Sequence, residues 1–359
     1  MSRKLLSYTA IGLILGSTAI ADVPKVAVDI APVHSLVSRV MEGVGSPKLI
    51  IPAGASPHEY SLRPSEAKSL QDADMVIWMG EDLAPWMENS IETLSKNAEV
   101  ITLLEESDTK LLDFREGALF EEHDHGDHDD HDKDHDDHDD HDDHDDHDDH
   151  DDHDDHDDHD KDHDDHDDHD HDKDHDDHDD HDDHDGHAHG EHDPHAWLSI
   201  ENAQTWLNLV AGKLSAADPD NAGVYFANAA AAREEINDLV KEVNSILEPV
   251  RGRNFIVFHD AYQYFETSFD FPAAGAISLG DATDPSAARI AEIQDRVKDE
   301  GINCVLSEPQ YNANLVATVL SGTDAKTGII DPLGLGLEPG SKLYGDLIRN
   351  MAKALAGCL

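Results

Sequence analysis

A tract of histidine and aspartate interrupts the chain at residues 121–192 and limits how the rest can fold. It holds 24 of the 28 histidines together with 38 Asp, 3 Glu and 3 Lys, so it carries −38 of the net charge of −56. The repeating HDDHDD pattern offers almost no apolar side chain to bury, so nothing offsets the entropy lost on ordering. We therefore predict a disordered insertion at 121–192, with the fold built from the segments on either side.

The first residues have the pattern of a secretory signal. Arg3 and Lys4 give a basic start, an apolar stretch runs over 11–20, and Ala19-Ile20-Ala21 is a small-residue cleavage site. The apolar stretch is too short to span a bilayer. We predict a signal peptide at 1–21, export to a bacterial periplasm and no membrane insertion.

The acidic balance excludes one class of partner. Outside the tract the net charge is −18, and no basic patch is visible that could hold nucleic acid or an anionic membrane surface. We therefore expect no nucleic-acid partner.

Short apolar runs alternate with helix-like patterns on both sides of the tract. Such alternation is typical of α/β folds with largely parallel sheets. Four predicted strands precede the tract and four follow it, at 26–30, 48–51, 75–78, 100–103, 255–258, 274–279, 303–306 and 327–330.

A long amphipathic helix separates the two sets of strands. Apolar residues recur at helical spacing between about 221 and 249, and at 1.5 Å per residue the helix would extend about 40 Å. We predict an N-terminal lobe at 22–218, a rigid inter-lobe helix at 219–252 and a C-terminal lobe at 253–359.

Only four histidines lie outside the tract, and three of them occupy positions typical of ligand sites. His58 and His259 follow the second and fifth predicted strands, and Asp331 follows the eighth. His195 precedes a helix that opens at Ser199. In open α/β folds, ligands bind at the carboxyl ends of strands.

Three imidazoles and one carboxylate form a suitable ligand set for a borderline-soft dication. Neutral imidazole suits zinc, copper, iron and nickel, whereas oxygen-only sets suit magnesium, calcium and manganese. His34, after the first strand, is interpreted as a neighbour of the site or as unrelated to it, rather than as a ligand.

Several stretches resemble a known family. These are GASPHEYSLRPSEAKSLQDADMVIWMG, HAWLS, FIVFHDAYQYF, CVLSEPQ and IIDPLG, and they run through both predicted lobes. The sequence resembles the periplasmic zinc-binding receptors of bacterial high-affinity zinc ABC transporters, the ZnuA-type members of the metal-binding solute-receptor family.

The resemblance implies a ligand set and a cargo. The family's metal ligands correspond to His58, His195 and His259, with Asp331 at the fourth position. Manganese-type relatives usually have Glu at the third position, so His259 implies Zn²⁺. Some zinc receptors have Glu immediately before the first His, where this chain has Pro57. The fourth ligand therefore stays open between Asp331 and a water molecule.

The chain has two cysteines, Cys304 and Cys358. An even pair in an oxidising compartment usually forms a disulfide, and two unrelated buried thiols are the alternative. Some zinc-type members of the family that the sequence resembles have a cysteine pair at these positions.

Together with the ligand set, the resemblance implies a monomeric receptor, not an enzyme, that captures Zn²⁺ between two lobes and delivers it to the membrane permease of an ABC transporter. The tract has ligand side chains without fixed geometry, so we expect it to act as a low-affinity zinc sink. One alternative is a periplasmic zinc buffer that needs no permease. Another is a zinc hydrolase, although the chain lacks a His-Glu-x-x-His motif and four protein ligands would leave no position for water.

Overall fold

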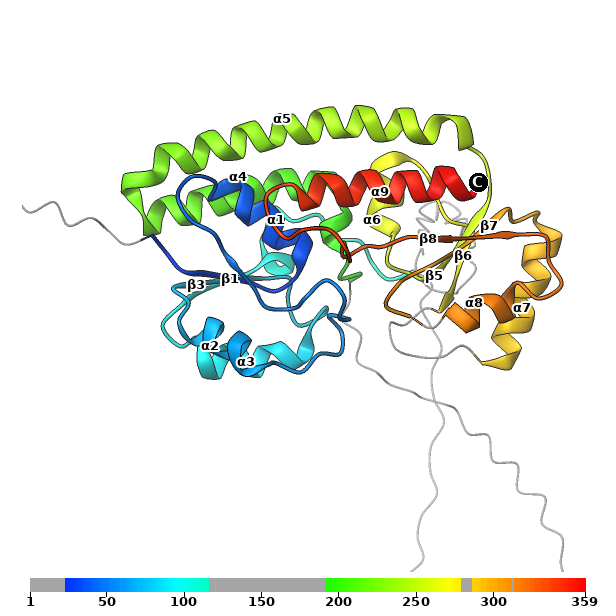
Figure 1. Cartoon of the computed structure of the whole chain (residues 1–359), viewed down its shortest axis with the longest axis horizontal. Coiled ribbons are helices and arrows are strands. Elements are labelled where there is room, and N and C mark those ends of the chain that lie inside the picture. The colour runs from blue at the N-terminus through cyan, green and yellow to red at the C-terminus, as the bar shows by residue number, and fades with distance from the viewer. Residues whose placement is uncertain (1–22, 116–119, 121–191, 279–285, 312) are drawn as a thin grey trace, which may run out of the picture. The chain divides into compact units, whose positions relative to one another are not determined.

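The computed structural model describes residues 23–115, 120, 192–278, 286–311 and 313–359 (Figure 1). The predicted signal peptide at 1–21 lies outside these residues. So does the predicted disordered tract at 121–192, apart from His192.

The first lobe contains a four-stranded parallel sheet. Its order is β2-β1-β3-β4, and β1 pairs with β3 from Val26 opposite Met75 onward. Figure 1 shows helix α1 on one side of this sheet and α2 and α3 on the other. The elements are β1 Val26–Val28, α1 Ala31–Val40, β2 Lys48–Leu49, α2 Pro64–Gln71, β3 Met75–Trp78, α3 Pro85–Leu94 and β4 Glu99–Thr102.

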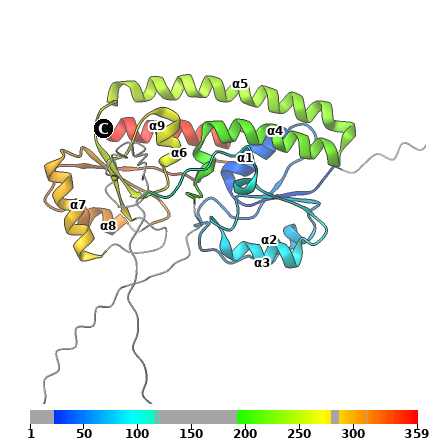
Figure 2. The same cartoon turned by 180° about the vertical axis from the view of Figure 1, so that it is seen from behind.

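The second lobe repeats this arrangement. Its parallel sheet has the order β6-β5-β7-β8, and helices α7 and α8 lie on the side opposite α9 (Figure 2). The elements are β5 Phe255–His259, α6 Gln263–Phe269, β6 Gly275–Ser278, α7 Ala287–Asp299, β7 Cys304–Ser307, α8 Ala313–Val319, β8 Lys326–Ile329 and α9 Leu343–Cys358. All eight predicted strands are therefore confirmed, and most of their ends differ from the prediction by one or two residues.

The long predicted helix is α5, Ala222–Leu247, whose 26 residues extend about 39 Å. It follows the short helix η2 (Ala196–Leu198) and α4 (Ile200–Ala217), and the single turns η3 (Pro219–Asn221) and η4 (Glu248–Val250) flank it. Its apolar stripe is buried against α4, α1 and α9. The C-terminal helix α9 thus runs beside α5 (Figure 1), and a single apolar core includes residues of both lobes. The predicted α/β class with two parallel-sheet lobes and a long connecting helix is confirmed.

A disulfide joins Cys304 of β7 to Cys358 of α9, as predicted, with the two Cα atoms 5.7 Å apart. Gly328 of β8 lies beside it. A Cβ atom at this position would meet Leu306 Cδ2 at 2.8 Å and Cys358 Cβ at 3.1 Å, so only glycine leaves room for α9 to approach the sheet.

No helix among the described residues combines the length and the apolar character that crossing a bilayer requires.

Candidate metal centre

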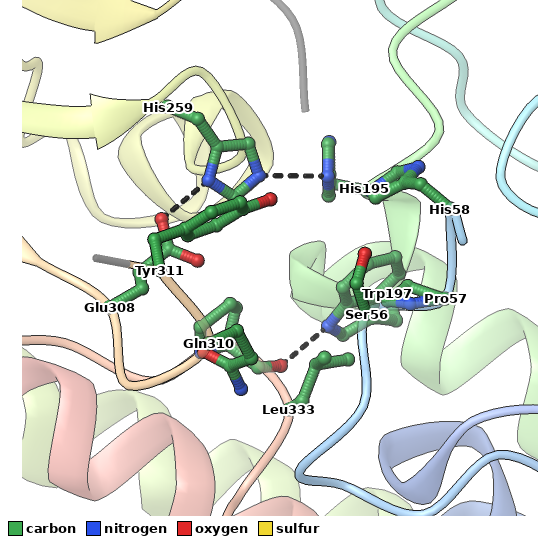
Figure 3. Close-up of a pocket in the computed structure, with 11 residues that line it drawn as sticks. Ser56, Pro57, His58, His195, Trp197, His259, Glu308, Gln310, Tyr311 and Leu333 are labelled. Atoms are coloured by element: carbon green, nitrogen blue, oxygen red, sulfur yellow. Dashed lines mark hydrogen bonds and ion pairs between the residues drawn. The ribbon is translucent and has the colours of Figure 1, made fainter. Parts of the chain in front are cut away.

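Three histidines that are distant in sequence meet where loops from the two lobes approach one another. An imidazole nitrogen from each of His58, His195 and His259 lies within 4.8 Å of the others (Figure 3). His58 comes from the loop between β2 and α2, His195 immediately precedes η2, and His259 ends β5. The structure therefore brings together the three predicted histidine ligands.

Two of the three histidines have ring nitrogens at the separation that a shared zinc ion would require. Nε2 of His195 and Nε2 of His259 lie 3.4 Å apart. Two nitrogens that each bind one zinc ion at about 2.0 to 2.1 Å, with a tetrahedral angle between them, would lie about 3.3 to 3.4 Å apart. The pair can thus bind one tetrahedral ion without moving closer or further apart.

A carboxylate fixes the orientation of His259. Its Nδ1 lies 2.5 Å from Glu308 Oε1, and both residues are buried. When Nδ1 is protonated, it donates a hydrogen bond to the carboxylate, and Nε2 then keeps its lone pair for a metal. The ring also packs edge-on against Tyr311, with centroids 5.2 Å apart.

A second carboxylate does the same for His195. Asp193 Oδ1 lies 2.7 Å from His195 Nδ1 and also accepts a hydrogen bond of 2.9 Å from the His195 backbone N–H. Trp197 packs beside the imidazole, with ring centroids 5.2 Å apart. Both buried histidines are thus held by an acid on Nδ1, and their Nε2 atoms face one another.

His58 lies on an irregular loop that is anchored on either side of it. The Trp86 indole N–H donates to the Pro57 carbonyl oxygen at 2.8 Å. On the other side, the Tyr60 hydroxyl donates to Glu66 at 2.9 Å. Glu66 also accepts the Arg63 backbone N–H at 2.7 Å, which caps the first turn of α2. These contacts fix the loop on both sides of His58, whose half-buried imidazole belongs to no strand or helix.

Asp331 has a different set of contacts. Its Oδ1 accepts hydrogen bonds from the backbone N–H groups of Leu333 and Gly334, both at 3.0 Å, and from Gln310 Nε2 at 3.2 Å. It lies outside the group of three histidines whose nitrogens fall within 4.8 Å. Its predicted role as the fourth metal ligand stays a prediction.

His34 also lies outside that group. It belongs to α1, where its Nε2 is 3.2 Å from the Pro47 carbonyl oxygen. Burial lowers the pKa of this imidazole. His34 therefore has a structural partner in its own lobe.

A buried ion cluster adjoins His259 in sequence. Arg115 forms ion pairs with Asp260 and with Glu266, the latter at 2.7 Å. Burial raises the pKa of both carboxyls, and Arg115 opposes this effect. Nearby, Asp113 forms an isolated antiparallel bridge with His192. The described residues that flank the tract thus lie next to the candidate centre.

Sequence reasoning did not identify Asp193 and Glu308 as functional residues. A signal was present in each case, because Asp193 lies two residues before a predicted ligand and Glu308 follows directly after β7, at the same sheet edge as His259. Nothing in the sequence showed which acidic residue would reach which imidazole.

Comparisons with known proteins are consistent with this geometry. Residues 26–358 match the family described as "ZnuA: Zinc-uptake complex component A periplasmic". Two relatives are both named High-affinity zinc uptake system protein ZnuA. The one from Brucella abortus (strain 2308) is 44% identical over 344 residues, covering 96% of this chain and 94% of the relative. The one from Paracoccus denitrificans (strain Pd 1222) is 45% identical over 349 residues, covering 96% and 95%.

Solved structures share the fold. The crystal structure of a ZnuA superposes with a TM-score of 0.66 at 18% identity, covering 94% of this chain and 99% of that one. The Zn(II)-bound ZnuA-like domain of Streptococcus pneumoniae AdcA gives 0.60 at 22% identity, covering 93% and 98%. The sequence match over nearly the whole chain shows that this protein belongs to the ZnuA family.

Proposed function

We propose that this chain is a periplasmic solute-binding receptor that captures Zn²⁺ and delivers it to the permease of an ABC transporter. The observation that carries the proposal is the 3.4 Å separation of the His195 and His259 Nε2 atoms, with His58 in reach of both. The relatives' shared name, High-affinity zinc uptake system protein, supports zinc as the cargo.

Capture replaces the hydration shell of the ion with imidazole nitrogens. Glu308 and Asp193 hold two of the rings with Nε2 directed at the ion, so binding costs little side-chain ordering. A third nitrogen comes from His58, and the fourth position goes to Asp331 or to a water molecule. A site of three imidazoles favours zinc over magnesium, calcium or manganese.

The predicted organisation fits this function. The signal peptide at 1–21 directs the chain to the periplasm, and the mature protein acts as a monomer. The N-terminal lobe at 22–218 supplies His58 and His195, and the helix at 219–252 joins the lobes. The C-terminal lobe at 253–359 supplies His259 and contains Asp331, the protein candidate for the open fourth position.

The tract at 121–192 acts as a low-affinity sink that gathers zinc near the receptor. If the tract were the main function, the protein would be a buffer rather than a transport receptor. Deleting residues 123–190 distinguishes a receptor from a buffer. If the protein is a receptor, the deletion variant keeps one tight zinc site and still supports growth under zinc limitation. The other alternative, a zinc hydrolase, would need an open coordination position for a reactive water. A hydrolase assay on the zinc-loaded protein tests this alternative.

Zinc titration in competition with a chelator tests the proposed site. His58→Ala, His195→Ala and His259→Ala should each weaken the tightest site by a hundredfold or more, because each removes one of very few preplaced ligands. His147→Ala in the tract is the matched control and should change little, since neighbouring repeats replace it. Equal, small effects for all four variants would refute the assignment.

A further inference from the structure

The loop that follows β7 carries two polar side chains with separate partners. Glu308 contacts His259 (Figure 3), whereas Gln310 contacts two other loops. Gln310 Nε2 lies 3.3 Å from the Ala53 carbonyl oxygen and 3.2 Å from Asp331 Oδ1. An amide nitrogen has two hydrogens, so it can donate to both acceptors at once. Gln310 therefore joins the loop that carries His58 to the turn that starts at Asp331.

That turn is also held against the first lobe by two other contacts. The Trp197 indole N–H donates to the Pro332 carbonyl oxygen at 2.9 Å, which links the segment after His195 to the turn (Figure 3). A Cβ atom at Gly54 would lie 3.1 Å from Leu335 Cδ1, so the two loops are in close contact. The turn at 331–335 thus lies against both first-lobe segments that carry histidines of the site.

We propose that Gln310 is a positioning residue that holds the His58 loop against the second lobe and slows the release of zinc. The inference rests on the proposed function of the site. His195 and His259 are each oriented by a carboxylate, and the backbone of the loop that contains His58 sets where this third histidine stands relative to His259. The Gln310–Ala53 hydrogen bond ties that loop, five residues before His58, to the lobe that contributes His259.

Replacing Gln310 by Met removes both donated hydrogen bonds and keeps a side chain of similar volume. Asp331 Oδ1 retains its two backbone donors, so no carboxylate oxygen loses all its partners. The fold should therefore persist. Because each neutral hydrogen bond contributes modestly, loss of both should accelerate zinc release by about five- to tenfold.

The test measures transfer of zinc from the full chain, loaded with less than one equivalent, to a fluorescent chelator in a stopped-flow instrument. Gln294→Met is the matched control, because Gln294 Nε2 also donates to a backbone carbonyl, that of Thr318 at 2.8 Å, between α7 and α8. Gln310→Met should release zinc five- to tenfold faster than Gln294→Met. The visible spectrum of the Co²⁺-loaded protein should not change, because the ligands are the same.

A release rate for Gln310→Met within about twofold of the control would overturn the inference. Gln310→Asn is a second variant, to be used if the Met variant does not fold. Its side chain keeps the amide but is too short to reach both acceptors, so it should also accelerate zinc release. A wild-type protein that shows no slow phase of release would instead refute the proposed function, and the role of Gln310 with it.

Discussion

Removing the charge of Glu308 should weaken zinc binding although Glu308 is not a proposed ligand. Its Oε1 lies 2.5 Å from His259 Nδ1, and only 4% of Glu308 and 3% of His259 is exposed, so solvent cannot replace the contact. Partners of this kind typically change metal affinity by about 10- to 100-fold, which corresponds to about 1.4 to 2.7 kcal/mol. Glu308→Gln keeps an acceptor for the Nδ1 proton and loses the charge, so we expect about tenfold. Glu308→Ala loses both and should approach a hundredfold.

The assay is competition for zinc with a chromophoric chelator at pH 7.5. Glu242→Gln is the matched control, because Glu242 accepts a hydrogen bond of 2.7 Å from Arg349 on the surface and lies away from the three histidines. Affinities of Glu308→Gln and Glu308→Ala that both stay within about threefold of this control would show that the carboxylate does not orient His259 for metal binding.

Three further predictions concern other parts of the chain. Burial raises the pKa of Asp29 to about 7 from 3.8, so its contribution to stability is full below about pH 4 and is lost as pH rises through about 7. Between pH 5 and 8 the free energy of unfolding of the wild type should therefore fall by about 2 to 3 kcal/mol relative to Asp29→Asn in denaturant titrations, and parallel pH profiles would contradict this. Reduction of the Cys304–Cys358 bond should lower stability by about 4 kcal/mol in the chain-entropy model but leave zinc affinity unchanged, since no proposed ligand is a thiolate. Asp331→Asn should lower zinc affinity by less than about tenfold, because the amide oxygen can accept the same hydrogen bonds, whereas a loss of a hundredfold or more would place the carboxylate on the ion.

The central strands could be predicted from sequence because helices cover both faces of each sheet. A strand buried on both faces is an uninterrupted apolar run, and Met75–Trp78 was predicted with its observed bounds. The first strand was predicted to extend to Ile30 but ends at Val28. Asp29 accepts hydrogen bonds from the Ile30 and Met79 backbone N–H groups and begins the turn into α1, and the apolar pattern does not reveal this.

The candidate site could be predicted only in part. Positions after strands identified His58 and His259, because ligands in open α/β folds bind at the carboxyl ends of strands, although these two strands belong to different sheets. The supporting contacts depend on tertiary structure: Glu308 lies 49 residues from His259, and Gln310 lies 257 residues from Ala53. His34 also follows a strand, but α1 begins at Ala31 and directs its ring to Pro47. Position relative to a strand does not distinguish these cases.

The zinc-loaded protein, crystallised and measured at wavelengths on either side of the zinc absorption edge, tests the central claim most directly. We predict that the strongest anomalous peak lies about 2.0 to 2.1 Å from Nε2 of His195 and of His259 and from one imidazole nitrogen of His58. A strongest peak bound by histidines of the 121–192 tract, with none among these three residues, would contradict the proposed zinc site.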